Sequence, residues 1–214
     1  MLDSRTAAAL MLQGMTAHYL TNDTYPLKPG DTCLIHAAAG GVGALLIQLA
    51  KMRGATVIGT TSTPIKAERA KAVGADHVIL YSQEDFEVRV KELTDGRGVQ
   101  VIYDAVGKAT FERGLDCLMP RGMMVLYGAS SGLVPPLDPQ VLNRKGSLFL
   151  TRPSLRHYIA TREELERRAG EVLTLATRGK LVATIDSSWP LAQAAAAHRK
   201  LQSRQTSGKL LLIP

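Results

Sequence analysis

The chain has 214 residues, a formal net charge of +7 and a hydrophobic fraction of 45%. This length is enough for one sizeable core, or for one domain and part of another. The lysines and arginines are scattered, which disfavours a nucleic-acid patch and favours a solvated surface with one or two cations directed at a phosphate. The apolar stretch near the N-terminus is interrupted at Gln13 and Gly14, so we expect neither a signal peptide nor a membrane span and predict a cytoplasmic protein.

Residues 1–30 predict a helical lead-in, possibly of two short helices broken at Gly14. Strands and helices then alternate through residues 31–153, a segment that predicts one domain. Apolar runs indicate six strands, at 31–38, 55–61, 77–81, 99–107, 122–130 and 146–151. Apolar residues at helical spacing indicate four helices between them, at 40–54, 63–75, 84–96 and 110–120.

Strands that alternate with crossover helices predict a parallel sheet with helices on both faces, the doubly wound Rossmann architecture. Such sheets bind ligands at the carboxyl ends of their strands. Residues 154–214 predict a helix at 161–179, a strand at 181–186, a helix at 191–204 and a last strand at 208–214. These late strands have no obvious partners, so we interpret them as the returning part of an incomplete second domain.

The sequence HAAAGGVG follows the first strand and opens a helix, which is the context that a dinucleotide-binding glycine turn requires. Gly40 lets the backbone approach a pyrophosphate, and Gly43 lets the helix lie close to the strand. The amino end of the helix supplies N–H groups and a positive dipole to the anion. Ala38 replaces the usual first glycine, which is tolerable if this position does not need a positive φ.

The second strand ends without the Asp or Glu that would bind a ribose 2′-hydroxyl and repel a 2′-phosphate. Ser62 can donate a hydrogen bond there, and Lys66 can supply a positive charge from the start of the next helix. Tyr81 ends the third strand beside the same pocket. These three residues predict a site for NADPH rather than NADH.

Other polar residues are interpreted without a catalytic role. Cys33, in a strand, and Cys117, in a helix, predict two buried free thiols, and no Cys/His spacing indicates a metal. His36 is expected to be a satisfied core histidine, and the other four histidines have no partners at ligand spacing. Asp104 is expected to order the DAVG turn by accepting backbone N–H groups.

The chain resembles the NADPH-dependent quinone oxidoreductases of the zinc-free medium-chain dehydrogenase/reductase superfamily, the zeta-crystallin type. The resemblance runs along essentially the whole chain and is carried by MLQGMTAHYL, TYPLKPGDTCLIHAAAGGVG, VIYDAVG, LDCLMPRGMMVLYGASSG, NRKGSLFLTRPSL and SGKLLLIP. It implies reduction of a quinone by NADPH without a metal or a protein nucleophile. It implies cofactor contacts at the following residues: Gly41, Val42, Val106, Gly107, Tyr127, Gly128, Ala129, Ser130 and Arg204.

Members of this family begin with a GroES-like barrel domain, whereas this sequence starts at the helix that follows it. We therefore expect the chain to be the cofactor domain with the C-terminal return, and to reduce quinones poorly alone, since the barrel forms the other wall of the cleft. No catalytic residue is identified. The strand at 147–151 predicts an exposed sheet edge, and the resemblance implies that it joins a second copy in a homodimer.

Two other functions stay open at this point. An enoyl reductase, including the polyketide synthase type, shares the glycine turn and the metal-free site. A noncatalytic protein that senses NADPH, or that binds RNA through its basic face, would also fit the composition.

Overall fold

A computed structural model describes residues 2–203 and 206–214, and its core is a six-stranded parallel sheet. The strands are β1 (Thr32–Ile35), β2 (Thr56–Thr61), β3 (His77–Leu80), β4 (Val99–Asp104), β5 (Leu118–Leu126) and β6 (Phe149–Thr151). Their spatial order is β3-β2-β1-β4-β5-β6. This order confirms the predicted doubly wound sheet, and it reverses direction between β1 and β4, where such sheets bind ligands.

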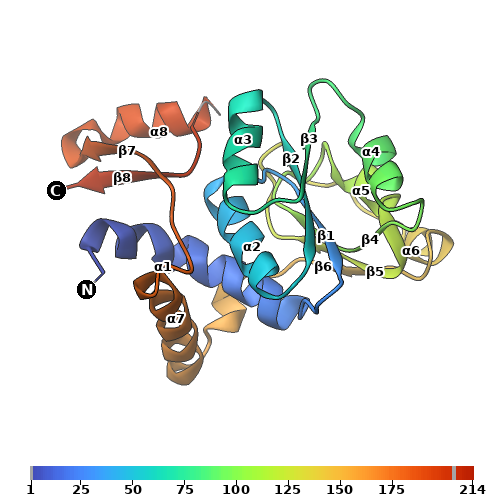
Figure 1. Ribbon diagram of the computed structural model, residues 1–214, viewed down its shortest axis with the longest axis horizontal. Helices are drawn as coiled ribbons and strands as arrows, with labels where there is room; N and C mark the ends of the chain where they lie inside the picture. The colour runs from blue at the N-terminus through green and yellow to red at the C-terminus, as the bar shows by residue number, and fades with distance from the viewer. Residues whose placement is uncertain (1, 204–205) are drawn as a thin grey trace.

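Helices cover both faces of this sheet (Figure 1). They are α2 (Gly41–Met52), α3 (Pro64–Ala72), α4 (Phe86–Leu93), α5 (Phe111–Leu115) and α6 (Gln140–Arg144). Side chains alternate between the two faces along each strand. In β1, Cys33 and Ile35 join the core under α2, while Leu34 joins the core that contains Phe86 of α4. Burial on both faces explains why this strand is apolar throughout.

The N-terminal segment forms one continuous helix, α1 (Ser4–Tyr19), followed by a π-helical turn at Leu20–Thr24. Asp3 caps α1 by accepting hydrogen bonds from the N–H groups of Arg5 and Thr6, each at 3.0 Å. The predicted break at Gly14 is therefore wrong. A Cβ at Gly14 would lie 2.7 Å from Cγ1 of Val172 in α7 (Arg162–Thr177), so the glycine permits close helix contact rather than a break.

A group of buried and half-buried ionic side chains, here called the α1–α7 ion cluster, fixes these two helices together. Arg168 is 1% exposed and donates hydrogen bonds to Asp23 Oδ2 at 2.6 Å and to His18 Nδ1 at 3.0 Å. The opposite ring nitrogen, Nε2 of His18, lies 2.7 Å from Glu171 Oε2. Burial lowers the pKa of His18, and the neighbouring Glu171 opposes that shift. The cluster gives His18 partners that sequence spacing does not reveal.

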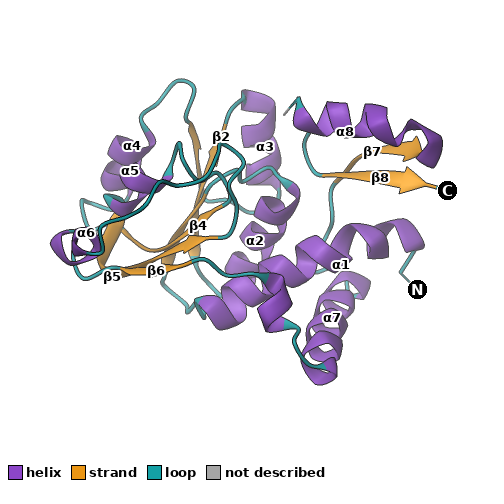
Figure 2. Cartoon of the chain, turned by 180° about the vertical axis from the view of Figure 1, so that it is seen from behind, coloured by secondary structure: helices purple, strands orange, loops and turns teal. Residues whose placement is uncertain are grey.

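The C-terminal elements form a small sheet apart from the main one (Figures 1 and 2). β7 (Ile185–Pro190) pairs in parallel with β8 (Lys209–Ile213), and α8 (Ala194–Gln202) connects them. The late strands thus do have partners in this chain, namely each other. β7 also begins four residues later than the strand predicted at 181–186.

The segment after the fourth strand differs from its prediction. α5 ends at Leu115, and residues 118–120 belong to β5 rather than to a helix. Cys117 therefore lies in the turn between them and not inside a helix. Both cysteines are free and buried as predicted, and burial raises the pKa of each thiol to about 12. Among the described residues, no helix has both the length and the apolar character needed to cross a membrane.

Candidate functional site

The glycine turn lies at the carboxyl end of β1, beside the point where the strand order reverses. Ala44 donates to the carbonyl of Gly40 at 2.9 Å, so the N–H groups of residues 41–43 precede the first hydrogen bond of α2 and point along the helix axis. A Cβ at Gly43 would meet the carbonyl oxygen of Ala37 and lie 2.9 Å from Cα of Ala38. The turn therefore presents backbone donors for an anion, and Gly43 permits the expected close contact between helix and strand.

The left-handed residue of this turn is Ala37, with φ of 54°, whereas Ala38 has a negative φ. This geometry explains why alanine is tolerated at position 38. The α1 helix also reaches the turn, which sequence reasoning missed. A Cβ at Gly41 would lie 2.5 Å from Nε2 of Gln13, so the amide of Gln13 lies directly over the glycine.

The three residues predicted to bind a 2′-phosphate lie around the carboxyl ends of β2 and β3. Ser62 follows β2 and Tyr81 follows β3, and the N–H of Tyr81 donates to the Thr61 carbonyl at 3.1 Å. The Ser82 hydroxyl donates to the Ser62 carbonyl at 3.0 Å, which ties the two strand ends together. Lys66 lies in the first turn of α3, and the Tyr81 side chain is largely exposed. The structure thus brings hydroxyls and a cation to one edge of the sheet.

The turns after β4 and β5 form one hydrogen-bonded unit. The carboxylate of Asp104 accepts from the N–H groups of Val106 at 2.6 Å and Gly107 at 3.1 Å, as expected for the DAVG turn. The N–H groups of Tyr127 and Gly128 donate to the Asp104 carbonyl, and the N–H of Ser130 donates to the Ala105 carbonyl. These bonds bring all of the residues predicted in the two turns together: Val106, Gly107, Tyr127, Gly128, Ala129 and Ser130.

Gly107 and Gly128 are required for this contact between the two turns. Gly107 has φ of +85°, and a Cβ there would lie 2.8 Å from the Gly132 carbonyl oxygen. A Cβ at Gly128 would lie 2.8 Å from Cα of Ala105. Tyr127 packs against the core under α2, and burial raises the pKa of its hydroxyl well above the usual range.

His36 lies beneath the glycine turn and is 1% exposed. Its Nδ1 atom lies 2.9 Å from Oγ1 of Thr60, and its ring meets the Phe86 ring edge-on with centroids 5.1 Å apart. Its Nε2 atom has no hydrogen-bond partner among the described residues. The expectation of a satisfied core histidine therefore holds for one ring nitrogen only. Burial lowers the pKa of His36, and the charge of Asp104 opposes the shift.

Two further predictions have different outcomes. Arg204 lies outside the described residues, so its contact with a cofactor remains a prediction. Within residues 2–203 and 206–214, no three His, Cys, Asp or Glu side chains gather in the way that a metal site requires. A metal-free reaction also remains a prediction.

Solved structures share this architecture. Escherichia coli quinone oxidoreductase complexed with NADPH superposes with a TM-score of 0.97 at 47% identity, covering 100% of this chain and 66% of that chain. In sequence, this chain is 49% identical to quinone oxidoreductase 1 of E. coli over 97% of its own length. It is 47% identical to the 2-haloacrylate reductase of a Burkholderia species over its whole length. It spans 64% of each of these two relatives, somewhat less than two thirds.

A family model described as zinc-binding dehydrogenase matches residues 41–174. That range runs from the first residue of α2 into α7, and it includes Ser62, Lys66 and Tyr81 and the paired turns after β4 and β5. The match covers more than half of the chain and agrees with the quinone oxidoreductases found by sequence and by structure. The chain therefore belongs to the zinc-binding dehydrogenase family, with quinone oxidoreductases of the medium-chain dehydrogenase/reductase superfamily among its relatives.

Proposed function

We propose that this chain is the NADPH-binding part of an oxidoreductase that reduces quinones. The observation that carries the proposal is the edge formed by β2, β3 and α3, where Ser62, Lys66 and Tyr81 lie and no ribose-binding carboxylate follows β2. A cation and hydroxyls at this place favour a 2′-phosphate, which a carboxylate would repel. The NADPH complex of the E. coli relative supports the same cofactor.

The other parts of the cofactor would contact two further segments of the chain. The amides of Gly41, Val42 and Gly43, at the amino end of α2, would hold the pyrophosphate. The paired turns at 106–107 and 127–130 would hold the nicotinamide ribose and cover one side of the ring. When bound, NADPH supplies the hydride. The task of the chain is then to orient the ring and to exclude water from one of its faces.

The test compares two lysines of α3. Lys66→Ala removes the cation from the pocket, whereas Lys71→Ala removes a lysine of the same helix that pairs with Glu68 at 3.0 Å on the surface. Since a hydrogen bond to a charged group contributes about 1.5–3 kcal/mol, Lys66→Ala should weaken NADPH binding roughly tenfold or more. NADH affinity should change little, and Lys71→Ala should affect neither cofactor. Calorimetric titration measures both, and an unchanged preference for NADPH in Lys66→Ala would contradict the proposal.

Reduction of an activated alkene is a second candidate, since the 2-haloacrylate reductase matches about as closely as the quinone oxidoreductases. A quinone and a 2-haloacrylate both present a carbon–carbon double bond conjugated to a carbonyl group. An enoyl thioester has the same feature, so an enoyl reductase stays in this group. Steady-state NADPH oxidation by the protein that carries this chain, with each substrate in turn, separates the three.

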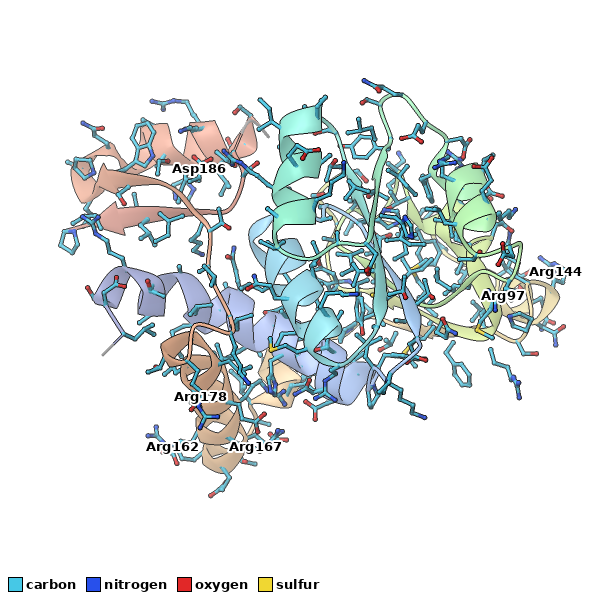
Figure 3. All side chains as sticks on the ribbon, in the orientation of Figure 1. Arg97, Arg144, Arg162, Arg167, Arg178 and Asp186 are labelled. Atoms are coloured by element: carbon cyan, nitrogen blue, oxygen red, sulfur yellow. The ribbon has the colours of Figure 1, made fainter. Side chains whose placement is uncertain are left out.

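RNA binding is the weaker alternative. Figure 3 shows Arg162, Arg167 and Arg178 around α7, whereas Arg97 and Arg144 lie at the opposite end of the molecule. This separation does not favour a single basic face. We also propose a reducing, cytoplasmic location, which the two buried free cysteines support.

We further propose that the protein is a homodimer in which β6 pairs with its own copy. β6 pairs with β5 on one side and is the last strand of the sheet. Phe149 is 56% exposed and Leu150 is 38% exposed, which is unusual for apolar residues at an uncovered edge. The strand is shorter than the predicted 147–151 segment, because Ser147 has φ of 56° and the N–H of Leu148 donates to the Leu142 carbonyl at 3.0 Å.

A further inference from the structure

Three polar side chains lie in a row beneath the glycine turn, at the carboxyl ends of β2, β1 and β4. Ile35 is in register with Gly59 and with Tyr103, which places the next residue, His36, between Thr60 and Asp104. All three are at most 1% exposed. Residues two positions earlier in each strand, Leu34, Ile58 and Ile102, belong to one apolar core, so this row closes the end of that core.

Each member of the row is joined to a different part of the crevice. Thr60 precedes Thr61 and Ser62, and its carbonyl accepts the N–H of Ala38 in the glycine turn at 3.1 Å. His36 leads directly into that turn. Asp104 holds the turn after β4 through Val106 and Gly107, and its other oxygen accepts from the Thr110 hydroxyl at 2.8 Å. The row therefore connects the ends of three strands that would line the proposed NADPH site.

The tautomer of His36 is linked to the direction of its hydrogen bond with Thr60. If the Thr60 hydroxyl donates to Nδ1, the neutral ring carries its proton on Nε2, on the side of the ring away from Thr60. Nε2 has no hydrogen-bond partner among the described residues, so the Asp104 carboxylate, whose residue stands in register beside His36, acts on the ring through its charge alone. Burial disfavours the doubly protonated ring, which keeps the histidine neutral.

We propose that Thr60, His36 and Asp104 form a positioning row for the cofactor, with His36 as its neutral, Nε2-protonated centre. The row sets the spacing between the 2′-phosphate pocket, the glycine turn and the turn after β4. It touches no substrate and acts through the backbone that it holds. This inference rests on the proposed NADPH site.

Substitutions at Thr60 separate positioning from packing. Thr60→Val keeps the shape of the side chain and removes the hydroxyl, while Thr60→Ser keeps the hydroxyl and removes a methyl group. We expect Thr60→Val to weaken NADPH binding about tenfold, equivalent to roughly 1.4 kcal/mol. Thr60→Ser should bind NADPH nearly as tightly as the unsubstituted protein. Urea unfolding of both variants measures the accompanying change in stability.

A change at His36 tests the link to β4. His36→Phe keeps a ring against Phe86 but removes both nitrogens. Because 2′,5′-ADP lacks the nicotinamide half, it should not depend on the turn after β4, so His36→Phe should weaken NADPH by a larger factor than it weakens 2′,5′-ADP. Nitrogen NMR of the unsubstituted protein at neutral pH should show His36 with its proton on Nε2.

Failure of the positioning row can be distinguished from failure of the proposed NADPH site. An unsubstituted protein that does not bind NADPH overturns the proposed function and this inference together. Normal NADPH binding in the unsubstituted protein and in Thr60→Val, with only a loss of stability, overturns the positioning row alone. Equal effects of Thr60→Val and Thr60→Ser, or a His36 proton on Nδ1, would also overturn it.

Discussion

Gly14 lies where α1 contacts Val172 of α7, and adding one methyl group there tests how tightly the two helices fit. A Cβ at this position would lie 2.7 Å from Cγ1 of Val172 and 3.6 Å from Cδ2 of Leu10. The contact with Val172 is well inside van der Waals distance. Val172 is fully buried, so its methyl group has little room to move away.

Two opposing terms decide the effect of Gly14→Ala. Alanine is better than glycine in a helix interior by about 1 kcal/mol. Overpacking of a buried contact costs about 1–3 kcal/mol. We therefore expect a net loss of roughly 1 kcal/mol in the free energy of unfolding. Val172→Ala alone should cost about 2 kcal/mol, because it removes two buried methyl groups and leaves a cavity.

The double variant Gly14→Ala with Val172→Ala gives the decisive measurement. The new Cβ would occupy part of the space vacated by the valine, so the double variant should be more stable than the sum of the single losses by about 1–2 kcal/mol. Urea unfolding followed by circular dichroism measures all four proteins. Additive losses, or a stabilised Gly14→Ala protein, would show that α1 and α7 do not meet at Gly14.

The other predictions concern acid stability and assembly. The folded pKa of His18 lies below its usual value of 6.5, so its contribution to stability is present above that pH and is lost as the pH falls. We expect the free energy of unfolding to decrease by up to about 1.4 kcal/mol for each unit that the pH falls below 6.5 through this group. His18→Gln should reduce this dependence on pH, and an identical dependence in the variant would contradict the assignment. Phe149→Lys should yield monomers in sedimentation, because charge on an edge strand opposes pairing. The control Val88→Lys, on the exposed face of α4, should leave the assembly unchanged. A dimer that survives Phe149→Lys would place the interface elsewhere.

The strands and helices of the main sheet could be predicted because the signals that mark them lie within each segment of the sequence. The run through β1 is apolar throughout because both faces are buried, and α2 shows helical spacing followed by Gly54. Gly14 misled the prediction for a physical reason. Its meaning depends on Val172, which is 158 positions away in the chain, and a glycine at a helix crossing is locally identical to one that ends a helix.

The predicted boundary between α5 and β5 was wrong for a second reason. The segment before Pro120 contains helix-forming residues, yet β5 begins at Leu118. Arg121 has φ of 64°, and the pairing of β4 with β5 shifts register between Val99 and Val101. An irregular strand start of this kind is held by its partner strand, so the sequence of β5 alone does not reveal it.

The site shows the same division between local and distant information. The positions of Ser62, Lys66 and Tyr81 follow from elements that the sequence already locates, because Ser62 and Tyr81 come after β2 and β3 and Lys66 lies in the first turn of α3. Their contact with a cofactor stays a prediction. The role of His36 depends on which residues stand opposite it in β2 and β4. That register follows once the strand order is known, because His36 lies one residue beyond Ile35 and the same step leads to Thr60 and Asp104. A polar residue at the last buried position of a central strand is therefore best interpreted together with the same position in both neighbouring strands, since the register brings the three residues to one level of the sheet.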